Sequence, residues 1–203
     1  MQLDHLAVVC ADLTGGVDYV QQSLGVALQP GGQHARYGTH NWLLSLGPGE
    51  YLEVIAPDPA APVPEFPRWF GLDRTTAPRL GNWIARVPDL GTARAATSQD
   101  IGEIVDLRRG DLQWRIAVPP DGSLPLNGAF PTLIEWQGTA PHPSARLTDR
   151  QVRLVRLDIS HPAASTLVDI IGKPMADPRI RFHPGPLGLQ ATFSTPSGER
   201  HLS

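Results

Sequence analysis

The chain has 203 residues, of which 41% are hydrophobic and 18% are charged. This composition supplies enough apolar side chains for a sizeable core and excludes a disordered chain, and the length suits one large domain or two small intertwined ones. Glycine (20 residues) and proline (21 residues) are frequent, which favours many short elements joined by turns and excludes a long coiled coil.

The net charge is −3 and the basic residues are scattered, so the sequence indicates no nucleic-acid partner. The longest apolar run, residues 6–11, is too short for a membrane span or a secretion signal, which predicts a cytoplasmic protein with no membrane partner. The single cysteine, Cys10, lies in that run, so we expect it to be buried and inert.

The first segment, residues 1–56, has the pattern strand, helix, strand, strand, strand. A strand is predicted from Asp4 to Val9, and a helix follows between an N-cap at Asp12 and a terminator at Gly25. Further strands are predicted over 43–46 and 50–55 on either side of a glycine-rich turn.

A proline-rich linker over 57–79 follows, with one short helix whose aromatic cluster, residues 66–72, we interpret as a cover for a core edge. The segment 80–138 then repeats the first pattern. It has a strand over 82–87, a helix from the N-cap Asp89 to Gly102, and strands over 114–118 and 132–136.

After a second linker, 139–151, a third and shorter βαβββ-like segment covers 152–203. It comprises a strand over 154–159, a helix ending at Gly172 and a last strand over 199–202. Because no crossover helix separates the later strands of any segment, we predict an α+β fold of curved mixed sheets with the helices on the convex side.

Three charged or polar side chains fall in otherwise apolar strands. Strand alternation places His5 on the face that turns away from the helix, and it places Glu53 with Tyr51 on the corresponding face of its own strand. Glu135 occupies the equivalent position of the second segment. An unpaired carboxylate costs several kcal/mol to desolvate, so each carboxylate requires a partner, a ligand or water.

These repeats carry a family resemblance. The opening Asp4-His5-Leu6 and the closing Tyr51-Leu52-Glu53 resemble the vicinal oxygen chelate superfamily, which includes glyoxalases and extradiol dioxygenases. The motifs at 38–41, 51–56, 87–90 and 133–136 are similar to a bacterial group of glyoxalase-like domain proteins, over residues 2–172.

The resemblance implies a cup formed by paired βαβββ modules, with a divalent metal held by residues of the first and fourth strands. Carried onto this sequence, the metal ligands are His5, Glu53 and Glu135, while Asn82 replaces the usual histidine. One imidazole and two carboxylates suit Mn²⁺, Fe²⁺, Zn²⁺ or Mg²⁺, and an open coordination position would polarise a carbonyl or enediolate.

Two functions remain open at this stage. The first is a metal-dependent lyase, isomerase or dioxygenase acting on a small oxygenated metabolite, which the paired carboxylates favour. The second is a metal-free protein of the same fold that binds or sequesters a small molecule, which Asn82 favours. The sequence also leaves open whether the third segment pairs within the chain or across a homodimer.

Other polar residues extend the candidate site. His40 is a candidate base, substrate contact or extra ligand, or else a hydrogen-bonded strand histidine, and Glu135 has a second candidate role as a catalytic group. The candidate substrate contacts are Asn41, Asn82, Arg86 and Arg115, although exposure at a sheet edge is the favoured explanation for one or both arginines. We assign the remaining histidines to the surface, namely His34, His142, His161, His183 and His201.

Overall fold

The computed structural model describes residues 1–203 and contains two β-sheets. The larger has eight strands in the order β2-β3-β4-β1-β5-β8-β7-β6. Its first half comprises β1 (Gln2–Val9), β2 (Gln29–His34), β3 (Thr39–Ser45) and β4 (Tyr51–Pro57). Its second half comprises β5 (Arg79–Arg86), β6 (Glu103–Arg109), β7 (Leu112–Val118) and β8 (Thr132–Gln137).

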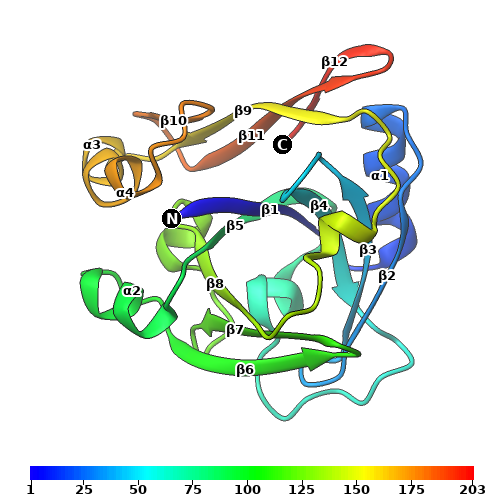
Figure 1. Cartoon of the computed structure of the whole chain (residues 1–203), viewed down its shortest axis with the longest axis horizontal. Coiled ribbons are helices and arrows are strands. Elements are labelled where there is room, and N and C mark those ends of the chain that lie inside the picture. Colours follow the sequence, from blue (N-terminus) through cyan, green and yellow to red (C-terminus); the bar gives the residue numbers. More distant parts are fainter.

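The two halves have the same internal topology. In each, the first strand lies parallel to the fourth, β1 with β4 and β5 with β8, and the halves join through the antiparallel pair β1 and β5. The sheet curls so far that its outermost strands, β2 and β6, contact each other. The predicted α+β fold of repeated βαβββ modules around a cup is therefore confirmed (Figure 1).

Helix α1 (Leu13–Leu24) forms where the sequence predicts it. The side chain of Asp12 accepts a hydrogen bond from the backbone N–H of Gly15 at 2.7 Å, and Gly25 ends the helix in the left-handed conformation with φ 70°. The buried side of the helix, including Val17 and Val20, packs on the convex face of β3 and β4.

Helix α2 (Leu90–Ala96) is shorter than predicted. The hydroxyl of Thr97 accepts a hydrogen bond from the backbone of Gln99, which turns the chain out of the helix well before the expected stop at Gly102. That glycine, with φ 86°, instead leads into β6, where an added Cβ would lie 2.2 Å from the carbonyl carbon of Val118.

The C-terminal segment forms the smaller sheet, in the order β10-β9-β11-β12. Its strands are β9 (Arg153–Ser160), β10 (Ile180–His183), β11 (Gly188–Thr195) and β12 (Gly198–Leu202). The predicted helix is divided into α3 (Ala164–Leu167), the π-helical turn η4 (Val168–Gly172) and α4 (Lys173–Met175). Because β9 pairs with β10 and β11 instead of with its fourth strand, this segment does not repeat the topology of the two halves.

The smaller sheet covers the convex face of the larger one beside α1, as Figure 1 shows. Three short 3₁₀ helices lie in the connections, namely η1 (Trp69–Arg74), η2 (Pro125–Gly128) and η3 (Pro143–Arg146). None of the helices combines the length and the apolar character that crossing a membrane requires.

Two apolar clusters mark the two faces of the eight-stranded sheet. Leu6, Trp83 and Leu133 belong to the cluster on the convex side, whereas Ile84 and Ile134 belong to the cluster inside the cup. Cys10 is fully buried in the convex cluster, where burial raises the pKa of its thiol to about 12. The prediction of a buried cysteine is confirmed, and such a thiol is unreactive at neutral pH.

Candidate functional site: a polar wall inside the cup

The cup contains a cavity of about 30 Å³ with two unlike walls. The first half of the sheet contributes most of its polar lining, and the second half contributes mainly aromatic and aliphatic side chains. The polar group is His5, His34, Asn41, Tyr51, Glu53 and Arg109, and the apolar group is Trp69, Phe70, Trp114, Ile116, Ile134 and Trp136.

Glu53 lies at the centre of the polar wall with only 5% of its surface exposed. Its Oε1 accepts a hydrogen bond of 2.5 Å from Nδ2 of Asn41, and its Oε2 lies 3.7 Å from Nε2 of His5. Asn41 is itself fixed, because its Oδ1 accepts a 2.7 Å bond from the backbone of Gly32. At Gly31, an added Cβ would lie 2.1 Å from that oxygen, so the glycine makes room for the amide.

His5 is oriented by Asp4. A register shift in β1, between Leu3 and His5, brings the two neighbouring side chains together, with 2.7 Å between Asp4 Oδ1 and His5 Nδ1. Asp4 is fully buried, and its Oδ2 accepts a hydrogen bond of 2.9 Å from Trp136 Nε1. The same oxygen lies 3.1 Å from Nε2 of His142.

Burial alone would raise the pKa of Asp4, but hydrogen bonds with His142 and His5 outweigh it and hold this pKa well below its ordinary value. Asp4 is therefore ionised at neutral pH and draws the ring proton of His5 to Nδ1. Nε2 of His5 is then the atom that faces Glu53 and the cavity. The carboxylate of Asp4 therefore fixes the orientation of the His5 ring.

Arg109 extends from the end of β6 and bridges the two edges of the curled sheet. Its Nη1 lies 3.1 Å from Nε2 of His34 and 3.4 Å from Oδ1 of Asn41. Burial, with a further contribution from Arg109, lowers the pKa of His34 to about 3. His34 is therefore neutral, and it accepts the guanidinium hydrogen bond while its Nδ1 faces Thr39 Oγ1 at 3.1 Å.

Glu135 does not join this group. In β8 the cup-facing side chains are Ile134 and Trp136, so Glu135 projects to the convex side. There its Oε2 accepts hydrogen bonds from the backbone of Leu90 at 2.7 Å and from Arg115 at 3.2 Å, and its Oε1 accepts one from Gln137. The predicted convergence of His5, Glu53 and Glu135 is wrong, because Glu135 lies one residue away from the cup-facing positions of β8, whereas Glu53 occupies such a position in β4.

His40 also lies outside the cup. It alternates with Asn41 along β3 and lines a separate surface pocket beside the start of α1, where its Nδ1 is 4.0 Å from Asp58 Oδ1. Arg115 lies on the convex side with Glu135. Asn41 is the predicted substrate contact that lines the cavity.

Asn82 and Arg86 lie near the cup without lining the cavity. Asn82 is fully buried and bonded internally, since its Nδ2 donates to Thr132 Oγ1 at 3.0 Å and its Oδ1 accepts from the backbone of Trp83 at 2.9 Å. Arg86 donates to the carbonyl of Gly49 at 2.6 Å and to Asp4 at 3.3 Å.

Sequence reasoning missed part of the site. His34 and His142 were expected at the surface, yet His34 is buried and His142 contacts the hidden Asp4. The glycine pair before His34 resembles a turn in the sequence, so no strand was predicted there. Arg109 carries no local signal, because it reaches the site only through the curling of the sheet.

The implied metal was tested against these donors. Only His5 and Glu53 face the same point, while Asn82 and Glu135 are committed to other partners. No group of three or more histidine, cysteine, aspartate or glutamate side chains converges to hold a metal ion anywhere in the chain. The residues present therefore do not complete the four-ligand centre that the resemblance implies.

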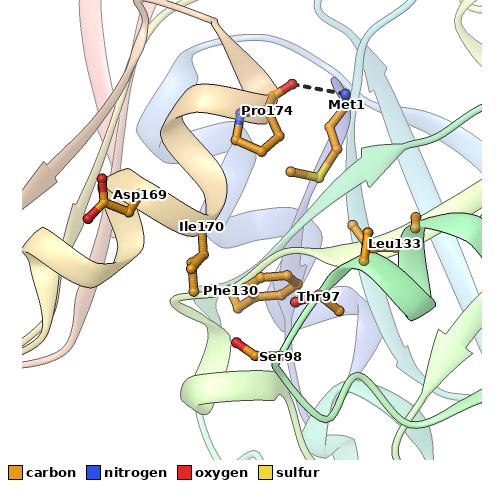
Figure 2. Close-up of a pocket in the computed structure, with 10 residues that line it drawn as sticks. Met1, Thr97, Ser98, Phe130, Leu133, Asp169, Ile170 and Pro174 are labelled. Atoms are coloured by element: carbon orange, nitrogen blue, oxygen red, sulfur yellow. Dashed lines mark hydrogen bonds between the residues drawn. The ribbon is translucent and has the colours of Figure 1, made fainter.

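Roomier pockets lie away from the cup. Figure 2 shows one of about 400 Å³ between α2 and the C-terminal segment, with Phe130, Leu133 and Ile170 in its lining. Its one carboxylate, Asp169, forms an exposed ion pair of 3.0 Å with Lys173. This pocket has no buried group for chemistry.

Comparison with known proteins identifies the family of the chain. Residues 3–172 match the glyoxalase-like domain family. The chain therefore belongs to this family. None of the curated proteins matches the sequence significantly.

Several solved structures are similar to this one at low sequence identity. A hypothetical protein from Staphylococcus aureus has a TM-score of 0.62 at 13% identity, over 92% of this chain and 87% of its own. Methylmalonyl-CoA epimerase from Mycobacterium tuberculosis has a TM-score of 0.43 at 21% identity, over 70% of this chain and 91% of its own. A methylmalonyl-CoA epimerase in complex with methylmalonyl-CoA has a TM-score of 0.42 at 16% identity, over 68% and 94%.

Proposed function

We propose that the cup is the active site of an enzyme that transfers a proton on a small oxygenated molecule, with His5 as the proton carrier. The observation that carries this proposal is the buried chain of Asp4, His5 and Glu53, with contacts of 2.7 Å and 3.7 Å. A histidine positioned by a buried carboxylate is a common general base.

Each residue has a distinct role in this reaction. Nε2 of His5 removes a proton from a carbon next to a carbonyl group, and the electron pair of that C–H bond moves onto the carbonyl oxygen to form an enolate. The imidazolium that results is stabilised by Asp4 on one side and by Glu53 on the other. His5 then returns a proton to the same carbon, which restores the carbonyl.

Asn41 is a positioning residue for Glu53. Its amide donates to one carboxylate oxygen and leaves the other facing His5. The 3.7 Å between Glu53 and His5 exceeds a direct hydrogen bond, so a substrate hydroxyl or carbonyl oxygen has room beside both groups.

A divalent metal would have His5 and Glu53 as its only protein ligands in the cup. The reaction proposed here uses proton transfer between side chains and substrate, and no step depends on a bound ion. The aromatic wall formed by Trp114 and Trp136 favours a second candidate, a protein that holds a small molecule without converting it. The cytoplasmic location and the homodimer remain predictions.

Exchange of substrate protons with solvent tests the proposal. The protein is incubated in D₂O with a panel of small 2-oxo acids, 3-oxo acids and hydroxyketones, and loss of the proton next to the carbonyl is followed by NMR. We expect the wild type to exchange this proton, and we expect the rate for His5→Gln to be at least about 10²-fold lower. His201→Gln, which changes an exposed histidine, is the matched control. Binding without exchange would favour the second candidate.

A further inference from the structure

We infer that the molecule bound in the cup carries a carboxylate that pairs with Arg109, next to a keto or hydroxyl group that faces His5 and Glu53. This inference rests on the proposed function for the position of the reacting group. It defines the substrate class as small 2-oxo or 2-hydroxy acids.

Arg109 is the permanently charged cation of the cavity lining. Its partners are the neutral ring of His34 and the amide oxygen of Asn41, and neither neutralises its charge. Both bonds use Nη1, which leaves Nε and Nη2 for a further acceptor. A guanidinium with two free donors in a partly buried setting suits the two oxygens of a carboxylate.

The position of Arg109 is set by the local backbone. An added Cβ at Gly32 would lie 2.8 Å from Cδ and 3.2 Å from Nε of Arg109, so the glycine lets this side chain pass close against β2. The neighbouring Arg108 faces the other way and donates to the carbonyl of Gly110 at 3.0 Å in an exposed position. Two adjacent arginines thus differ in whether they reach the cavity.

Trp69 supplies a second, independent sign of a missing acceptor. This side chain lines the cavity with 3% exposure, and its indole N–H is buried with no hydrogen-bond partner. The ring is held between Tyr37 and Phe70, at centroid distances of 4.4 and 4.8 Å. A buried donor without an acceptor is costly, so a ligand oxygen within reach would relieve that cost.

Asn41 fixes how far apart the two ends of the ligand lie. The same side-chain amide accepts from Arg109 and donates to Glu53, so one amide group separates the cation from the proton-transfer pair. A carboxylate on Arg109 therefore places the adjacent carbon of the ligand beside His5 and Glu53. In a 2-oxo or 2-hydroxy acid that adjacent carbon carries the keto or hydroxyl group, and in a 2-oxo acid the proton that His5 removes is on the following carbon, C3.

The size of the cavity limits the ligand to a few carbon atoms. A cavity of about 30 Å³ holds on the order of two water molecules, so any organic acid must displace part of the wall. Trp69 and Phe70 form the wall that comes from the irregular connection η1, and Phe70 has a positive φ of 59°. Movement of this connection on binding would change the environment of Trp69.

Tryptophan fluorescence tests the inference directly, since Trp69, Trp114 and Trp136 line the cavity. The full chain is titrated with glyoxylate, pyruvate and lactate, and with pyruvamide as the uncharged counterpart of pyruvate. We expect saturable quenching by the acids and at least tenfold weaker binding of pyruvamide.

Substitutions at the two arginines separate the site from surface charge. Arg109→Met is expected to raise the Kd for pyruvate at least tenfold and Arg109→Lys by less, while Arg108→Met leaves it unchanged. Trp69→Phe, which removes only the N–H donor and part of the ring, is expected to raise the Kd about threefold. Circular dichroism melting confirms that each variant is folded, and Arg109→Lys serves if Arg109→Met is not.

Several outcomes would overturn the inference: no binding of any acid, equal binding of pyruvate and pyruvamide, or unchanged Kd in both Arg109 variants. His5→Gln keeps this test distinct from that of the proposed function, because it should lose proton exchange while its binding of pyruvate still weakens when Arg109 is replaced. Arg109-dependent binding without proton exchange would refute the proposed function alone. If the protein exchanges protons on neutral ketones, and Arg109→Met does so at the same rate, the carboxylate inference alone is refuted.

Discussion

The two halves of the eight-stranded sheet have the same topology and opposite inner surfaces. In the first half, β1 and β4 direct His5 and Glu53 into the cup, whereas in the second half β8 directs Ile134 and Trp136 there. The carboxylate of the second half, Glu135, instead accepts a hydrogen bond from the start of α2. The two halves therefore repeat the topology without repeating the side chains that face the cup. The first half supplies most of the polar wall, and the second half packs against it.

Replacing Asp4 should give the largest change in stability, because its buried carboxylate binds several side chains around the polar wall. Asp4→Ala is expected to lower the free energy of unfolding by about 3 kcal/mol, since it leaves His5, Arg86 and Trp136 without their buried carboxylate. Urea denaturation measures the change. Asp106→Ala, at an exposed ion pair, is the control and should change stability by less than about 0.5 kcal/mol. Equal losses in both variants would contradict this account of the anchor.

The two glutamates should differ in stability as they differ in position. Glu135→Ala is expected to cost about 2 kcal/mol, because it removes the acceptor of the buried N–H of Leu90 and the partner of Arg115. Glu53→Leu should keep the fold and cost less, about 1 kcal/mol, because relief of the buried carboxylate partly offsets the hydrogen bond that Asn41 loses. A larger loss for Glu53→Leu in the same denaturation experiment would show that Glu53 is structural.

The comparison also explains what the sequence could and could not predict. Helix α1 follows from local signals, namely Asp12 as N-cap and Gly25 as terminator, and the βαβββ order follows from turn residues. Predicting which face of a strand a side chain lies on depends on the alternation of polar and apolar residues. Strand β8 is buried on both faces, so Leu133, Ile134 and Glu135 give no such alternation. A shift of one residue then inverted the predicted position of Glu135.

The site needed information that no local pattern holds. Arg109 and His34 meet because β2 and β6, the outermost strands of the two halves, approach each other when the sheet curls. Asp4 faces His5 because of a register shift against β5, which depends on the partner strand. Long-range pairing, more than residue type, decides which polar residues enter the cup.

The buried side chain of His34, in the first half of the sheet, should make the stability of the protein depend on pH. The pKa of His34 is about 3 in the folded protein and about 6.5 when exposed, so between these values the unfolded chain binds a proton that the folded chain does not. Stability is complete above pH 6.5 and falls as the pH is lowered toward 3, by about 1.4 kcal/mol per pH unit within this window.

This pH dependence is measured by urea denaturation between pH 7 and pH 5, on the wild type and on His34→Gln. The wild type should lose about 2 kcal/mol more than the variant over this range. His201→Gln, at an exposed position, should retain the wild-type slope. If His34→Gln also retains the wild-type slope, the neutral, buried state assigned to His34 is wrong.

Added metal should have the smallest effect, because the second half contributes no ligand to the cup. Protein purified without chelator and dialysed is expected to contain no stoichiometric Mn²⁺, Fe²⁺ or Zn²⁺ by elemental analysis. Its melting temperature should not change on addition of these ions or Mg²⁺. One equivalent of retained metal, lost in Glu53→Leu but kept in the wild type, would restore the metal-dependent mechanism.

The central claim is that one half of the sheet carries the chemistry, and the matched pair Glu53→Gln and Glu135→Gln tests it most directly. Proton exchange into the most active 2-oxo acid is followed in D₂O by NMR for both variants at equal folded concentration. We predict a rate at least about 10²-fold lower for Glu53→Gln and a rate within about twofold of the wild type for Glu135→Gln. Loss of exchange in Glu135→Gln, with Glu53→Gln still active, would contradict the account.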